Sequence, residues 1–451
     1  MADRIIILGA GESGTGAALL ADSKGFEVYL SDSGAIASKY KAKLDKANIH
    51  YEEGGHDYSK WVGAVLMVKS PGIPPQADPI KWCKKNNIPV IGEIEWGARF
   101  TNKPIIGITG TNGKTTTTLL THHLVKSGGL NYALTGNVGK SFAEAVIENE
   151  KYDGYVIEVS SFQLDDIVEF KPKIAVLLNV TPDHLDRYDN SMELYLSSKM
   201  RIVANMDKND HFIANISDEY TAKGVKEVKE KVNLITLGAN DTDINIDVRE
   251  NEINFNLDKR NFTVKSDDLP VKGPHNMINA GAAIAAAIKS GVSETDIRKG
   301  LDSFENAPHR LQLITEINGA SYVNDSKATN VEAVYYALKS FDNPIIWIAG
   351  GVDKGNDYEM ILPLVKEKVK ALICMGTDNK KLVDAFGDHV RTFDTGSLKK
   401  AMAVAYAEAR PGDIVLLSPA CASFDLFKNY EDRGNQFIEA INNLKEEVSD
   451  D

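Results

Sequence analysis

The chain has 451 residues, of which 43% are hydrophobic and 25% charged, and its formal net charge is −13 at pH 7. The composition is that of an ordinary globular protein, and the length predicts about three domains. The acidic balance argues against general binding to nucleic acid or to anionic membranes, although it leaves room for a local nucleotide site.

The first region, residues 1–98, alternates short apolar strands with helical stretches, a pattern that predicts a Rossmann-like domain with a parallel sheet. The expected strands are residues 5–8, 28–30, 64–68 and 89–91. Residues 101–104 are expected to form a linker to the next domain.

A glycine-rich turn follows the first of these strands. Residues 9–14 read GAGESG and match the dinucleotide-binding pattern G-x-G-x-x-G, and Asp32 follows the second strand at the distance of a ribose partner. Alone, this turn would indicate a nicotinamide-dependent dehydrogenase. The same turn serves any diphosphate, however, so we interpret it as a nucleotide-diphosphate site. A tight turn without a ligand is the alternative.

A second glycine-rich loop opens the next region, residues 99–306, and is the most specific signal in the chain. Residues 107–118 read GITGTNGKTTTT, between an expected strand and an expected helix at residues 119–125. Such a loop cradles phosphates with its backbone N–H groups, while Lys114 reaches the β- and γ-phosphates and Thr115 holds Mg²⁺. The strict P-loop spacing requires glycine where this chain has Ile108, so this is a variant P-loop. The alternative is a Gly/Thr-rich turn without a ligand.

Polar residues follow the later strands of this central region, which we expect to form a P-loop ATPase-type domain with a parallel sheet. Glu158 ends an expected strand at residues 155–159, where an acid takes part in Mg²⁺ binding in P-loop enzymes. His184 follows the next strand, at residues 174–178, and could be a metal ligand or hold substrate phosphate. Lys199 lies on an expected helix and by itself is interpreted as a surface lysine.

Two further segments of this region have a clear pattern. Residues 240–266 alternate in polarity and predict a peripheral antiparallel patch. Residues 276–289 form an expected alanine-rich helix whose small side chains indicate close packing.

The third region, residues 307–451, again alternates strands with helices and predicts a second Rossmann-like domain. The expected strands at residues 344–349, 371–375 and 414–417 lead into Gly350, Gly376 and Ser418. Ligands of parallel sheets bind beyond the carboxyl ends of strands, so these ends predict one cleft and a second ligand pocket.

These motifs together resemble the Mur ligases, the ATP-dependent amide ligases of peptidoglycan precursors. The resemblance covers nearly the whole chain and rests on the following stretches: residues 110–115, 158–161, 183–187, 309–310 and 325–330. Residues 418–425 and 433–434 are most similar to the members that add D-glutamate to UDP-N-acetylmuramoyl-L-alanine.

The resemblance implies a role for each matching residue. It assigns ATP binding to Gly110, Thr111, Asn112, Gly113, Lys114, Thr115, Thr116, Asn276, Asn279, Arg310 and Asp325. It assigns catalysis to Lys114, Glu158, His184 and Lys199, and two Mg²⁺ ions to Thr115, Glu158, His184 and a carbamylated Lys199. It assigns the UDP-sugar substrate to Ser13, Asp32, Ser33, Gly72, Asn137, Gly139, Ser160 and Gln163. It assigns D-glutamate to Lys327, Thr329, Lys354, Ser423, Phe424 and Tyr430.

Two positions depart from the family pattern. Glu12 stands where the better-known enzymes carry an apolar residue against the uracil, and Val352-Asp353 replaces an expected Asp-Gly pair before Lys354. The reaction that the family implies forms an acyl phosphate by γ-phosphoryl transfer from ATP, which the amine of D-glutamate then attacks.

Three alternatives stay open at this point. A sister ligase that adds another amino acid, or a folate polyglutamate ligase, would differ in the pocket at Lys327, Ser423 and Phe424. A dehydrogenase would bind nicotinamide at residues 9–14. A non-catalytic nucleotide sensor would bind nucleotide without releasing phosphate.

We expect a cytoplasmic monomer that binds neither nucleic acid nor membrane. The N-terminus lacks the pattern of a signal peptide, and no stretch approaches the ~20 apolar residues of a membrane span. The three cysteines, Cys83, Cys374 and Cys421, form no metal-binding spacing, which is typical of free thiols in a reducing compartment.

Overall fold

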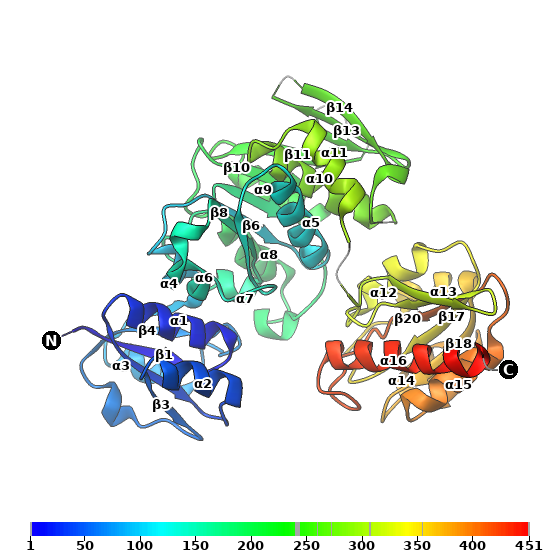
Figure 1. Cartoon of the computed structure of the whole chain (residues 1–451), viewed down its shortest axis with the longest axis horizontal. Coiled ribbons are helices and arrows are strands. Elements are labelled where there is room, and N and C mark those ends of the chain that lie inside the picture. Colours follow the sequence, from blue (N-terminus) through cyan, green and yellow to red (C-terminus); the bar gives the residue numbers. More distant parts are fainter. Residues whose placement is uncertain are drawn as a thin grey trace. The chain divides into compact units, whose positions relative to one another are not determined.

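The protein is described from a computed structural model, which covers residues 2–239, 244–258, 260–271, 273–305, 308–353 and 355–449. It is an α/β protein built on three separate sheets of five, nine and six strands (Figure 1). The predicted fold class, three domains with parallel-rich sheets, is confirmed. Among the described residues, no helix is long and apolar enough to span a membrane.

The N-terminal sheet is entirely parallel, with strand order β3-β2-β1-β4-β5. Its strands are β1 (Arg4–Leu8), β2 (Glu27–Asp32), β3 (His50–Glu53), β4 (Ala64–Lys69) and β5 (Val90–Gly92). Its helices are α1 (Glu12–Ser23), α2 (Ser38–Lys46), α3 (Asp78–Lys85) and α4 (Glu93–Ala98).

Alternation along β1 explains why helices cover both faces of this sheet. Ile5 and Ile7 are buried in one apolar cluster, whereas Ile6 and Leu8 are buried in another, which contains Trp61. Successive side chains of a strand point to opposite faces, so a continuous apolar run requires cover on both sides. The run of apolar residues at 5–8 therefore dictates a sheet with helices on both faces.

The central sheet has the strand order β14-β13-β12-β11-β10-β9-β6-β8-β7. Its strands are β6 (Ile105–Thr109), β7 (Tyr132–Gly136), β8 (Gly154–Glu158), β9 (Ile174–Leu177), β10 (His211–Asn215), β11 (Asn233–Gly238), β12 (Ile246–Val248), β13 (Glu252–Leu257) and β14 (Arg260–Lys265). Its helices are α5 (Lys114–Ser127), α6 (Phe142–Ile147), α7 (Ser161–Leu164), α8 (Met192–Met200), α9 (Glu219–Val228), α10 (Pro274–Lys289) and α11 (Glu294–Ser303).

The edge of this sheet and its alanine-rich helix agree with the sequence pattern. Strands β12, β13 and β14 pair antiparallel at one edge, as residues 240–266 predict, although 240–243 and 259 lie outside the described residues. Helix α10 lies against the sheet at Gly281, where an added Cβ would be 3.0 Å from a Leu237 methyl carbon. Its small side chains permit this close packing.

The C-terminal sheet has the strand order β15-β16-β20-β17-β18-β19, and only β15 runs antiparallel to its neighbour. Its strands are β15 (Gln312–Ile317), β16 (Ala320–Asn324), β17 (Ile345–Ala349), β18 (Val369–Met375), β19 (Arg391–Thr395) and β20 (Ile414–Leu417). Its helices are α12 (Val331–Lys339), α13 (Leu362–Lys368), α14 (Lys380–Phe386), α15 (Leu398–Glu408) and α16 (Tyr430–Ser449). Strands β20, β17 and β18 are parallel neighbours, so their carboxyl ends share one edge of the sheet.

The three sheets are grouped into two compact units. Met1–Pro270 and Met277–Phe304 make the first unit, which holds the N-terminal and central sheets. Val271–Asn276 and Glu305–Asp451 make the second. The domain boundaries expected at residues 98 and 306 stay predictions. The assignment of Val271–Asn276 to the second unit was not predicted from the sequence.

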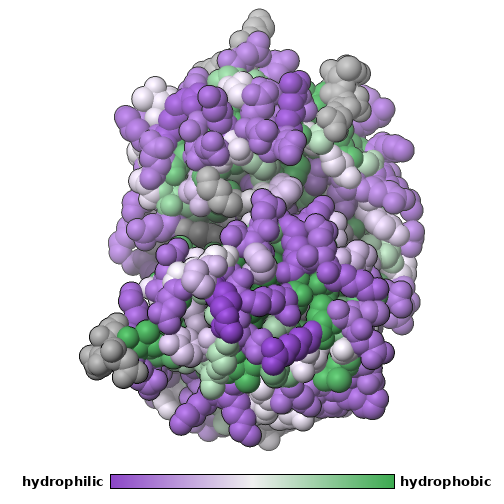
Figure 2. Space-filling view, turned by 90° about the vertical axis from the view of Figure 1, so that its right-hand side faces the viewer, coloured by the Kyte–Doolittle hydropathy of each residue, from purple (hydrophilic) through white to green (hydrophobic). Residues whose placement is uncertain are grey.

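Buried charged residues join the first two sheets. Glu95, which is fully buried, accepts hydrogen bonds at 2.9 Å from the backbone N–H groups of Val168, Glu169 and Phe170. Lys69 pairs with Asp166 while its side chain is 3% exposed. Because breaking such pairs would leave buried charges unsatisfied, these contacts hold the two sheets in one unit. The face of the molecule shown in Figure 2 is mainly hydrophilic.

Candidate active site

The loop between β6 and α5 has the backbone geometry of a phosphate cradle. Gly113 has a φ of +82°, and an added Cβ would lie 2.2 Å from Asn279 Oδ1. The N–H groups of Thr111 and Asn112 donate to Asn179 Oδ1 at 3.0 and 2.8 Å. The strand, the loop and the helix N-terminus that the sequence predicts are therefore present, and Asn279 lies against the loop; the ATP-binding roles of these residues stay predictions.

Two lysines converge on one carbonyl of this loop. Lys114 Nζ donates to Gly110 O at 2.9 Å and to Thr111 O at 2.7 Å, and Lys199 Nζ donates to Gly110 O at 2.8 Å. Lys199 is only 1% exposed, so its interpretation as a surface lysine from sequence alone is wrong. Burial, reinforced by the nearby Lys114 ammonium, lowers the pKa of Lys199 well below its ordinary value.

A carboxylate at the end of β8 fits a cation. Glu158 is 4% exposed, and its Oε2 has no hydrogen-bond partner in the part of the chain that the structure describes. Thr115 is also buried. The described residues contain no cluster of three or more His, Cys, Asp or Glu side chains that could hold a metal by themselves. This suits Mg²⁺, which usually takes one or two protein oxygens and completes its shell with phosphates and water.

Seven of the predicted residues of the first unit line one cavity of about 390 Å³. The predicted residues among its lining are Ser13, Gly72, Lys114, Asn137, Ser160, His184 and Lys199. The residues that sequence reasoning did not assign are Pro71, Ser161, Phe162, Asp183 and Tyr195. The cavity thus brings the glycine turn after β1, the loop after β4 and the phosphate cradle together.

Four residues predicted to bind the UDP-sugar are not among those lining this cavity: Asp32, Ser33, Gly139 and Gln163. Gln163 Oε1 accepts from Ser160 N at 2.8 Å and caps α7. Asp32 Oδ2 accepts from Ala10 N at 2.7 Å and so fixes the glycine turn. In that turn, a Cβ on Gly14 would lie 1.7 Å from Gly9 O, so α1 packs directly on the turn. These roles in binding stay predictions.

Comparison with known proteins decides the family. Residues 4–78 match a model described as the MurD N-terminal domain, 108–287 the Mur ligase middle domain, and 309–421 the Mur ligase glutamate ligase domain. A UDP-N-acetylmuramoylalanine--D-glutamate ligase of Christiangramia forsetii is 47% identical over 98% of this chain and 100% of its own length. One from Bacteroides fragilis is 45% identical over 98% and 100% of the two chains.

The chain belongs to the Mur ligase family. Solved structures of lower sequence identity share its fold. A UDP-N-acetylmuramate-alanine ligase of Thermotoga maritima aligns with a TM-score of 0.64 at 20% identity, covering 99% of this chain and 100% of that one. A pseudomurein peptide ligase of Methanothermus fervidus aligns with a TM-score of 0.63 at 20% identity, covering 98% and 100%.

The second unit of this Mur ligase carries the remaining residues that are predicted to bind the nucleotide: Asn276, Arg310 and Asp325. Asp325 is 7% exposed and accepts hydrogen bonds from Ser418 Oγ at 2.9 Å and from Leu311 N at 3.2 Å. Burial raises the pKa of Asp325 to about 7, although the nearby Arg310 opposes this rise. A carboxyl group with a pKa near 7 is unusual, and groups with strongly shifted pKa values cluster at functional sites.

Five of the six residues predicted to hold D-glutamate are described, and they follow the carboxyl ends of β16 and β20. Lys327 Nζ stands 5.2 Å from the centre of the Tyr430 ring. Ser423 is 2% exposed, whereas Phe424 is 72% exposed. Thr329 N donates to Lys327 O at 3.0 Å, and Lys354 lies outside the described residues. The structure therefore places these groups on the loops after β16 and β20, next to the helix α16.

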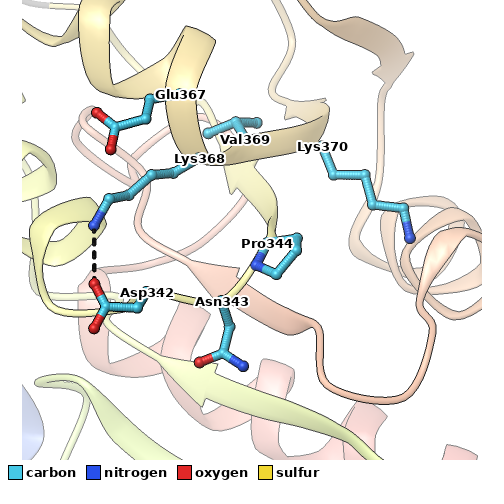
Figure 3. A pocket seen from close by; sticks show the side chains of 7 residues that line it. All are labelled: Asp342, Asn343, Pro344, Glu367, Lys368, Val369 and Lys370. Atoms are coloured by element: carbon cyan, nitrogen blue, oxygen red, sulfur yellow. Dashed lines mark ion pairs between the residues drawn. The ribbon is translucent and has the colours of Figure 1, made fainter.

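A further hollow of about 290 Å³ lies at the opposite edge of this sheet, where β17 and β18 begin (Figure 3). Lys368 lies 3.7 Å from Asp342, and Lys370 lies 2.7 Å from Asp413. Because carboxylates already neutralise both lysines, we assign no ligand to this hollow.

Two residues of the cradle could have been found from the sequence. Asn179 lies two positions after the end of β9 and, besides accepting from the loop, donates from Nδ2 to Asn112 O at 3.1 Å. Tyr195 precedes Lys199 by one helical turn, and its ring centre lies 4.4 Å from Lys199 Nζ. Their signals are position after a parallel strand and helical spacing, respectively.

Proposed function

We propose that this Mur ligase adds D-glutamate to UDP-N-acetylmuramoyl-L-alanine with ATP, in the synthesis of peptidoglycan precursors. The two relatives named above are D-glutamate ligases matched over their whole length, and this chain is 45–47% identical to them. The observation that carries the proposal is the cavity of about 390 Å³, in which the phosphate cradle and the N-terminal glycine turn meet.

The proposed reaction is the one that the Mur ligase family implies. A carboxylate oxygen of the substrate attacks the γ-phosphorus of ATP, which gives an acyl phosphate and ADP. The amine of D-glutamate then attacks the acyl carbon, phosphate leaves, and the amine nitrogen loses a proton. Two anions must approach each other in the first step, so the catalytic work is positioning and charge neutralisation, which Lys114 supplies.

Mg²⁺ when bound would neutralise phosphate oxygens, and we propose two ions. Thr115 and Glu158 would hold the ion at the phosphates, as the unpartnered Glu158 Oε2 supports. His184 and Lys199 would serve the second. A lysine must become an oxygen ligand to do so, and carbamylation requires a neutral amine. The lowered pKa of the buried Lys199 supports this modification.

The second unit carries the residues that would bind the acceptor amino acid and further residues that would contact the nucleotide. Lys327, Thr329, Lys354, Ser423, Phe424 and Tyr430 would hold D-glutamate, while Asn276, Arg310 and Asp325 would contact the nucleotide. Ser13, Asp32, Ser33, Gly72, Asn137, Gly139, Ser160 and Gln163 would hold the UDP-sugar. We further propose that the enzyme works as a cytoplasmic monomer.

The test is phosphate release from ATP in the presence of Mg²⁺ and UDP-N-acetylmuramoyl-L-alanine. D-glutamate, L-glutamate, L-lysine and meso-diaminopimelate are added in turn. Release that depends on D-glutamate alone is the expected result. Release with another amino acid would keep the ligase and reassign its acceptor, and nucleotide binding without release would favour a sensor or a folate acceptor.

A further inference from the structure

Asp353 stands where the family pattern has glycine, and its carboxylate accepts four hydrogen bonds. Oδ1 accepts from the backbone N–H groups of Gly355 at 2.7 Å and Asn356 at 3.0 Å, and from Lys381 Nζ at 3.0 Å. Oδ2 accepts from Tyr358 Oη at 2.9 Å. Burial alone would raise the pKa of Asp353, but the four hydrogen bonds outweigh it and lower the pKa below its ordinary value. The group is therefore an anion at neutral pH.

Lys381 holds this carboxylate from another element, the helix α14. Its ammonium also donates to Asn356 O at 2.6 Å and lies 5.6 Å from the centre of the Tyr358 ring. The Lys381 side chain is 50% exposed, so solvent screens the pair in part. Its geometric effect remains: the ammonium bridges a side-chain oxygen and a backbone oxygen of one loop, and so closes that loop on itself.

The same loop is fastened to the loop after β20. Val352 N donates to Ala422 O at 2.8 Å and Ala422 N donates to Val352 O at 3.1 Å. Asn356 Nδ2 donates to Ala420 O at 3.1 Å, and Tyr358 Oη lies 3.3 Å from Cys421 Sγ. Both residues that Asp353 orders, Asn356 and Tyr358, thus contact residues 420–421.

The loop after β17 is rich in glycine and needs the hydrogen bonds described above to hold one conformation. Gly350, Gly351 and Gly355 have φ values of +131°, +130° and +88°. Glycines lose more conformational freedom on folding than other residues, so a loop built on them orders only if other contacts compensate. Asp353 supplies those contacts in this chain.

We propose that Asp353, held by Lys381 and Tyr358, is a positioning residue for the acceptor amino acid. It orders the loop after β17, and that loop fixes residues 420–422, directly before the buried Ser423. This inference rests on the proposed function, because Ser423 matters only if it binds D-glutamate. Asp353 itself is not a catalytic residue, since it acts through the backbone of the neighbouring loop.

The test measures separate KM values for D-glutamate, ATP and the UDP-sugar in Asp353→Ala and Lys381→Met. In Asp353→Ala the loop after β17 should be less ordered, and the KM for D-glutamate should rise about tenfold. This is the effect expected when hydrogen bonds to a charged group are lost. The other two KM values should change less than about twofold. Lys381→Met removes one of the four contacts and should raise the same KM about threefold.

Lys380→Met is the matched control. Lys380 lies beside Lys381 on α14 and pairs with Asp384 at 2.5 Å, outside this network, so its variant should keep all three KM values. The double variant of Asp353 and Lys381 should be no worse than Asp353→Ala, since both residues act in one network.

An unchanged KM for D-glutamate in both variants would overturn the proposal. So would an equal rise of all three KM values together with a fall in melting temperature, the mark of a merely structural role. If Asp353→Ala fails to fold, Lys381→Met still tests the proposal, because the Lys381 side chain is half-exposed and its replacement should leave the fold intact. Wild-type enzyme in the same assay separates the two claims. Absence of D-glutamate-dependent release there would reject the proposed function, and the positioning role with it. Normal release by the wild type, with an unchanged KM for D-glutamate in both variants, would reject the positioning role alone.

Discussion

The buried carboxyl of Asp325 should make the C-terminal unit less stable at neutral pH than an uncharged equivalent would be. Its pKa rises from 3.8 to about 7 on folding, because burial penalises the charged form. Ionising this group in the folded state at pH 8 therefore costs about 4 kcal/mol, at about 1.4 kcal/mol per pKa unit. Asp325→Asn should remove that cost.

The direction of the pH dependence follows from the pH at which Asp325 loses its proton in the unfolded and in the folded state. Below pH 3.8 both states hold it, and the substitution has little electrostatic effect. Between 3.8 and about 7 the unfolded wild-type chain loses the proton first, so wild-type stability falls as the pH rises. Asparagine can still accept from Leu311 N and can donate to Ser418 Oγ, so both hydrogen bonds survive in the variant.

Urea unfolding of wild type and Asp325→Asn at several pH values measures this difference. The variant should be more stable by up to about 4 kcal/mol at pH 8, with the gain shrinking steadily toward pH 4. The two units need not unfold together, so the transition that the substitution moves is the one to compare. A gain that does not vary with pH, or a loss of stability at pH 8, would refute the reasoning. Turnover should fall in the same variant if Asp325 contacts the nucleotide.

Three further predictions concern the first unit. Lys114→Met should abolish phosphate release while leaving the melting temperature nearly unchanged; a normal turnover number would reject the phosphate role. Gly14→Ala should destabilise the protein by about 1–3 kcal/mol, because the new Cβ would lie 1.7 Å from Gly9 O. Gly11→Ala is the control: its Cβ would meet no atom within 4 Å, so it should lower the melting temperature less in the same experiment. Lys199→Ala should be inactive and partly rescued by short-chain carboxylic acids in the phosphate-release assay, and lack of rescue would leave Lys199 with a structural role alone.

The order of strands and helices, and the strand, loop and helix at residues 105–127, could be predicted from the sequence. Apolar runs such as residues 5–8 are local signals, and β1 spans Arg4–Leu8 in the structure. Glu158 at a strand end, and Lys114 at the start of a helix, are equally local. Their spacing carries the chemistry, so the family resemblance was already visible in the sequence.

Only the tertiary structure decided which groups lose contact with water and which distant segments meet. Lys199 is an ordinary helical lysine in sequence, and it becomes a buried amine because α8 packs its Nζ against Gly110 O, 89 residues away. Glu95 joins two sheets through backbone N–H groups some 75 residues further on. Asp353 seemed only a departure from a pattern until folding placed Lys381 beside it. Burial and long-range contact depend on how separate segments pack, and local periodicity and spacing do not contain that information.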